Sequence, residues 1–137
     1  MTAPTVPQLE AARPALLGLH ATLLDAERIE RERVRGRMPR GVWYAAVLED
    51  ESLAWLRPLG QLVAGFDEAL AEAVRTEVPL TREALAAFAG QARACVTPGP
   101  RYLELLQGHP DVVLAHRDAV KALAPLLPPP AQAERAS

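Results

Sequence analysis

The chain has 137 residues, of which 50% are hydrophobic and 23% charged, and its formal net charge is -2. This length favours one domain, and this composition excludes a disordered acidic protein and a membrane-spanning one. The small net charge gives no global attraction to nucleic acid or to anionic lipid. We expect a helical domain over residues 1–127 and a disordered tail over residues 128–137, where three prolines precede small polar residues.

Apolar spacing predicts helices throughout, because β-branched and aromatic residues are few and no long stretch alternates apolar and polar side chains. The first helix is expected over residues 7–35, with Pro14 kinking it or marking its first turn. Residues 42–48 form a short apolar segment after a break rich in glycine and proline. A second long helix is expected over residues 50–74, and Pro58 should bend it without ending it.

Three shorter helices complete the prediction. Thr81 is a good N-cap for the first of these helices. The second is short, contains Tyr102 and ends at Gly108, and the third begins at Pro110. The expected inner face of this last helix consists of Val112, Val113, Ala119, Val120 and Leu123. Segments of this length joined by short loops predict an all-α fold, a single-domain antiparallel bundle of four to six helices.

The only cysteine, Cys95, excludes an intrachain disulfide and every metal site that needs several cysteines. The first residues lack the positive region of a secretory signal, and no uncharged stretch reaches the roughly 20 apolar residues of a bilayer span. These features predict a cytoplasmic protein with no membrane partner.

Two histidines lie on the apolar arcs of predicted helices, His20 on the first and His116 on the last, so both should point inward. A buried imidazole needs hydrogen-bond partners, and one interpretation is that each histidine only fixes the helix packing. The alternative is that His20 and His116 face each other across a cavity and bind a small ligand or a metal ion. Glu27 lies on the same face as His20, about 10 Å away, so one metal ion could not join both directly. Cys95 or another carboxylate would have to complete a zinc site, and the cofactor stays unknown.

Residues 27–40 contain six arginines and three glutamates. Such a cluster can bind phosphate or nucleic acid. However, its i, i+4 pairs of opposite charge and its lack of aromatic residues favour a solvated helix face. Nucleic acid is therefore not the expected partner.

Trp43 and Tyr44 lie in a segment that is too short to define a face. If they are exposed, they form an anchor for a protein partner, because aromatic side chains dominate the energetics of interfaces.

Two stretches carry a resemblance. Trp-Leu-Arg-Pro-Leu at residues 55–59 is followed by Asp-Glu at 67–68, and Arg-Tyr with Leu-Leu at 101–106 is followed by Pro-Asp-Val-Val and a histidine at 110–116. This pattern resembles small all-helical proteins of unknown function from bacteria with GC-rich genomes. The resemblance implies a helical fold and no catalytic residue.

The sequence contains no Gly-x-Ser-x-Gly elbow, Walker loop or Gly-x-Gly-x-x-Gly motif, which weakens the case for an enzyme without excluding one. We expect a helical protein that binds another protein or itself, for which the segment with Trp43 and Tyr44 is the candidate surface. The alternative is a bundle that binds a ligand or metal through His20, Glu27 and His116.

Overall fold

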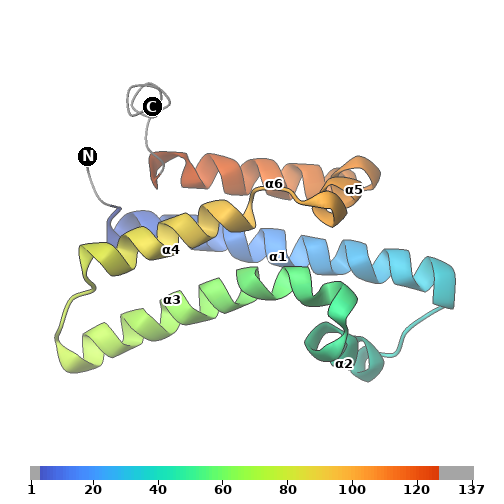
Figure 1. Cartoon of the computed structure of the whole chain (residues 1–137), viewed down its shortest axis with the longest axis horizontal. Coiled ribbons are helices and arrows are strands. Elements are labelled where there is room, and N and C mark those ends of the chain that lie inside the picture. The colour runs from blue at the N-terminus through green and yellow to red at the C-terminus, as the bar shows by residue number, and fades with distance from the viewer. Residues whose placement is uncertain (1–3, 127–137) are drawn as a thin grey trace.

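The structure, a computed structural model, describes residues 4–126. This part of the chain contains helices and no strand, which confirms the predicted all-α class (Figure 1). The predicted tail, residues 128–137, lies outside the described residues. The elements are α1 (Val6–Arg35), α2 (Arg40–Glu49), η1 (Glu51–Leu56), α3 (Arg57–Thr76), α4 (Arg82–Cys95), α5 (Pro100–Gly108), α6 (Pro110–Leu123) and η2 (Ala124–Leu126), of which η1 and η2 are 3₁₀ helices.

The long helix α1 lies in the middle of the bundle. Thr5 caps its N-terminus, because the hydroxyl accepts from the Gln8 backbone N–H while the Gln8 side chain accepts from the Thr5 N–H. Pro14 lies inside the helix, which continues as one element. Helix α6 runs beside α1 in the opposite direction, and α3 lies on the other side of α1 in this view, while α4 crosses α1 and contacts α1, α3 and α6 (Figure 1).

The region around Pro58 differs from the expectation. Instead of one bent helix, residues 51–56 form η1, and α3 begins at Arg57 with Pro58 in its first turn. A first-turn residue needs no backbone N–H donor, so proline costs nothing there. Arg57 donates to the carbonyl oxygens of Val47 and Asp50 and so closes the C-terminal end of α2.

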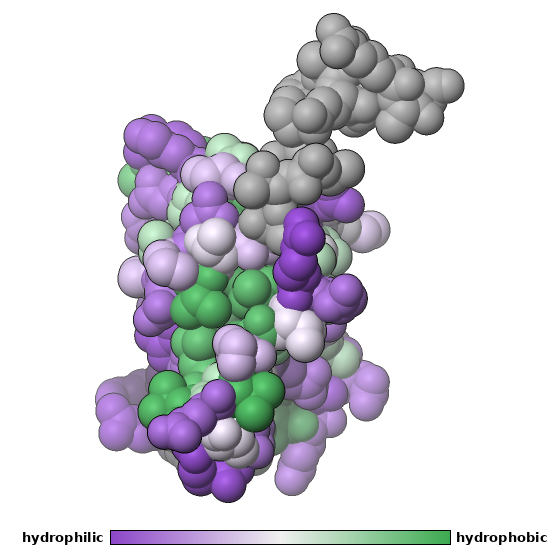
Figure 2. Space-filling model, turned by 90° about the vertical axis from the view of Figure 1, so that its left-hand side faces the viewer, coloured by the Kyte–Doolittle hydropathy of each residue, from purple (hydrophilic) through white to green (hydrophobic). Residues whose placement is uncertain are grey.

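Most buried residues form one cluster around the leucines of α1, and a smaller cluster of Leu9, Phe66, Leu85 and Ala89 adjoins it. At the end of the bundle where this second cluster lies, apolar atoms reach the surface (Figure 2). No helix within residues 4–126 has the length and apolarity to cross a membrane.

The predicted inner face of the last helix was too wide. Val113 and Val120 are 46% and 41% exposed, whereas Val112, Ala119 and Leu123 are fully buried. The neighbours of α6 cover a narrow arc centred near Ala119, so the residues at the edge of that arc remain partly in solvent.

Candidate functional site

Glu27 is the one buried charged side chain among the described residues, with 3% of its surface exposed. Its carboxylate accepts hydrogen bonds from the indole Nε1 of Trp55 and the guanidinium Nε of Arg101, both at 3.0 Å, and from Nη2 of Arg101. A buried carboxylate is tolerated only when such donors replace water. These bonds join α1, η1 and α5 at one point.

Arg101 extends this contact toward the surface. Its Nη1 donates to Glu104 at 2.8 Å, and 38% of its side chain is exposed. The hydrogen bonds to Glu27 raise the pKa of Arg101 further above its ordinary value, so the guanidinium keeps its charge.

A second polar contact joins α1 to the connection between α5 and α6. His109 Nε2 lies 2.9 Å from a carboxylate oxygen of Glu30, which also accepts from Arg33. The hydrogen bond to His109 lowers the pKa of Glu30. The C-terminal part of α1 therefore carries two carboxylates that hold α5 and its connection to α6.

The structure gives the two predicted histidines separate neighbours. His20 packs against α3 at Gly60, where an added Cβ would lie 3.2 Å from the imidazole Nε2. His116 pairs with α5, because its Nδ1 lies 2.6 Å from the hydroxyl of Tyr102. Burial raises the pKa of Tyr102, so its hydroxyl stays protonated beside the imidazole. Both imidazoles are half-buried and contact different helices, while Glu27 is bound to Arg101.

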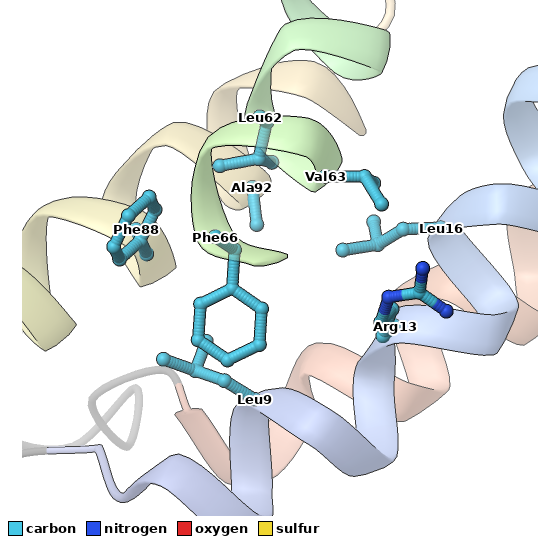
Figure 3. A pocket seen from close by; sticks show the side chains of 8 residues that line it. All are labelled: Leu9, Arg13, Leu16, Leu62, Val63, Phe66, Phe88 and Ala92. Carbon is cyan, nitrogen blue, oxygen red and sulfur yellow. The ribbon is translucent and has the colours of Figure 1, made fainter. Parts of the chain in front are cut away.

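Within residues 4–126, no three His, Cys, Asp or Glu side chains lie close enough together to hold one metal ion. A small apolar cavity of about 20 Å³ lies between α1, α3 and α4, with room for about one water-sized group (Figure 3). Arg13 lies at this cavity and pairs with Asp67. Neither His20 nor His116 lines this cavity. The residues that line it are Leu9, Arg13, Leu16, Leu62, Val63, Phe66, Phe88 and Ala92.

Three arginines of the run at residues 27–40 bind groups of the protein itself. Arg28 donates to the carbonyl of Met38, Arg31 pairs with Asp50 and Ser52, and Arg33 pairs with Glu30. These arginines hold the connections around the C-terminal end of α1. The expected solvated face is therefore wrong for Arg31, which is 13% exposed and pairs with Asp50, and for Glu27, which is buried and pairs with Arg101.

Helix α2 lies outside the main bundle, below the C-terminal end of α1 in this view (Figure 1). Of its ten residues, Trp43 alone is buried, with 6% of its surface exposed. Tyr44 is 58% exposed, Val42 is 53% exposed and Leu48 is 75% exposed. Of the two predicted anchor residues, Trp43 therefore attaches α2 to the core, and Tyr44 faces solvent.

At about 100° per residue, Gly41, Ala45 and Leu48 fall side by side on the exposed surface of α2, flanked by Val42 and Tyr44. We call these five residues the outward face of α2. The sequence alone could not place Val42 and Leu48 on it, because only the burial of Trp43 fixes how the helix is turned.

Comparisons with protein families, curated proteins and solved structures find no match to this chain.

Trp55 and Arg101, the partners of Glu27, and Tyr102, the partner of His116, were not predicted from the sequence. The available signal was Glu27 itself, because a carboxylate on the apolar face of a helix needs a buried cation or several N–H donors. Nothing in the sequence indicates which cation supplies them.

We expect the protein to lose stability at mildly acidic pH, because His20 and His116 are half-buried. Burial lowers the pKa of His20 and His116 below their ordinary value of 6.5. The unfolded chain therefore binds more protons as the pH falls below 6.5, and the free energy of unfolding decreases. The pKa values of Asp50 and Asp67 are lowered below 3.8, so the stability these carboxylates add is lost only at more acidic pH.

Urea denaturation at pH 7.5 and pH 5.5 measures this effect. We expect a smaller pH dependence in a variant that carries His20→Gln and His116→Gln. An unchanged difference between the two pH values in that variant would assign the pH dependence to other groups.

Proposed function

We propose that this protein acts by binding another protein through the outward face of α2. The observation that carries the proposal is the exposure of Val42, Tyr44 and Leu48 together on a helix whose one buried residue is Trp43. Contiguous exposed apolar side chains mark binding surfaces, and tyrosine supplies a large contact area at low entropic cost. A cytoplasmic location stays a prediction from the sequence.

The polar network supports this proposal indirectly. Arg31 fixes Asp50 at the end of α2, and Arg57 holds the last carbonyl groups of the same helix. The buried Glu27 holds Trp55 in η1, the element that follows α2. These contacts give α2 a fixed orientation, and a rigid binding surface loses less entropy on association.

Photo-crosslinking in cells that naturally make the protein tests the proposal. A photoreactive phenylalanine analogue in place of Leu48 should give a covalent adduct with a protein partner. The matched control replaces Leu114, an exposed leucine of α6 with 49% of its surface accessible, and should give none. Equal labelling from both positions, or no adduct from position 48, would refute a partner at α2.

A further inference from the structure

We propose that the partner of the outward face of α2 is a second copy of this chain, bound with the two α2 helices antiparallel. This inference rests on the proposed function and names the partner. Most homo-oligomers are two-fold dimers, in which one patch must complement itself in both shape and charge. Helix α2 meets both conditions.

The shape of the outward face is self-complementary. A Cβ added at Gly41 would meet nothing within 4 Å, so the surface is open there. Leu48 projects from the same face with 75% of its surface exposed, about 10 Å further along the helix. In an antiparallel pair centred between Tyr44 and Ala45, Leu48 of each copy lies over Gly41 of the other. Each leucine then fills the open space above a glycine.

The charges at the ends of α2 are also self-complementary. Arg37 and Arg40 lie at the N-terminal end, and Glu49 and Glu51 lie at the C-terminal end. All four are exposed, and none forms an ion pair within residues 4–126. An antiparallel pair places each basic end beside the acidic end of the other copy.

This charge order opposes the dipole of α2 itself. Helix N-termini favour acidic residues and C-termini favour basic ones, but α2 has no acidic residue in its first turn and no basic residue in its last. Arg40 and Glu49 are thus unfavourably placed within one copy, and an antiparallel second copy supplies opposite charge at both ends. Association therefore brings opposite charge to each end of α2, which the single chain does not do.

Light scattering and sedimentation of the full chain over a range of concentrations measure the association. We expect a concentration-dependent dimer, which Leu48→Asp abolishes. Gly41→Gln should raise the dissociation constant about tenfold, because the glutamine occupies the space that Leu48 of the other copy would fill. The same substitution should keep or raise the melting temperature, because glutamine is the better helix former and meets no neighbour. A monomer at all concentrations, or a dimer that Gly41→Gln leaves unchanged, would overturn the inference.

Charge reversal tests the antiparallel orientation. The basic-end variant carries Arg37→Glu with Arg40→Glu, and the acidic-end variant carries Glu49→Arg with Glu51→Arg. Each alone should be monomeric, because like charges meet at both ends, whereas an equimolar mixture should form a mixed dimer. Adding Leu48→Asp to both variants controls for attraction by net charge alone and should abolish the mixed dimer. Failure of the mixture to associate would refute the antiparallel pair.

The crosslinking experiment at position 48 separates this inference from the proposed function. An adduct with the mass of two chains supports both. An adduct with a different protein overturns the second copy as partner and leaves the binding role of α2 intact. The absence of any adduct refutes both.

Discussion

Replacing Arg101 with alanine should lower the free energy of unfolding by about 3 kcal/mol, at the lower end of the range for breaking a buried ion pair. The substitution leaves the carboxylate of Glu27, 3% exposed, with the indole N–H of Trp55 as its one remaining donor. The lower end applies because 38% of the Arg101 side chain is exposed, so water can enter where the guanidinium was. Urea denaturation followed by circular dichroism measures the loss. The matched control is Arg117→Ala on α6, whose side chain is 70% exposed, and it should change stability by at most about 0.5 kcal/mol.

A double-mutant cycle separates the ion pair from simple packing. Glu27→Gln removes the charge and keeps an oxygen that can accept from Trp55. In the Glu27→Gln background, Arg101→Ala should cost only about 1 kcal/mol, because no buried charge is left without its partner. An equal cost in both backgrounds would show that Arg101 contributes through its aliphatic stem and not through Glu27.

Leu105→Ala should lower the free energy of unfolding by about 2 to 5 kcal/mol, as for other fully buried leucines. Leu105 is 1% exposed and, with Tyr102, is one of two buried residues of the short helix α5. Its loss leaves a cavity beneath the helix that carries Arg101. Thermal and urea unfolding measure the effect.

Leu103 gives the matched control on the same helix, because its side chain is 47% exposed. Leu103→Ala removes the same atoms at the same helix propensity, and we expect a change of at most about 0.5 kcal/mol. If Leu103→Ala and Leu105→Ala lower the free energy of unfolding equally, α5 does not pack against the core through the face that carries Leu105.

Boundaries that depend on neighbouring residues could be predicted from the sequence. Thr81 caps α4 through the backbone N–H of Ala84, and Pro110 occupies the first turn of α6, both as expected. Pro58 was predicted less well, because a proline inside a run of helical periodicity fits either a bend or a first turn. The structure shows a first turn preceded by the 3₁₀ helix η1.

The candidate site divides in the same way. Helical periodicity predicts that Glu27, His20 and His116 lie on apolar faces. It does not predict which residues of other helices contact those faces. Arg101 lies 74 positions from Glu27 in the chain, and Tyr102 lies on a different helix from His116. Many cations and hydroxyls could satisfy these groups, so only the packing of α5 against α1 and α6 selects the ones that do.

The amino-acid order by itself determined the class of fold, most helix ends and the presence of polar groups on inner faces. These properties depend on interactions between residues three or four positions apart. The residues that make such interactions can be found directly in the sequence. The tertiary structure decided how α2 is turned, with Trp43 inward and Val42, Tyr44 and Leu48 in solvent. Which face of a ten-residue helix is buried depends on the helices that pack against it. The exposed face of α2 is therefore defined only after the other helices have packed.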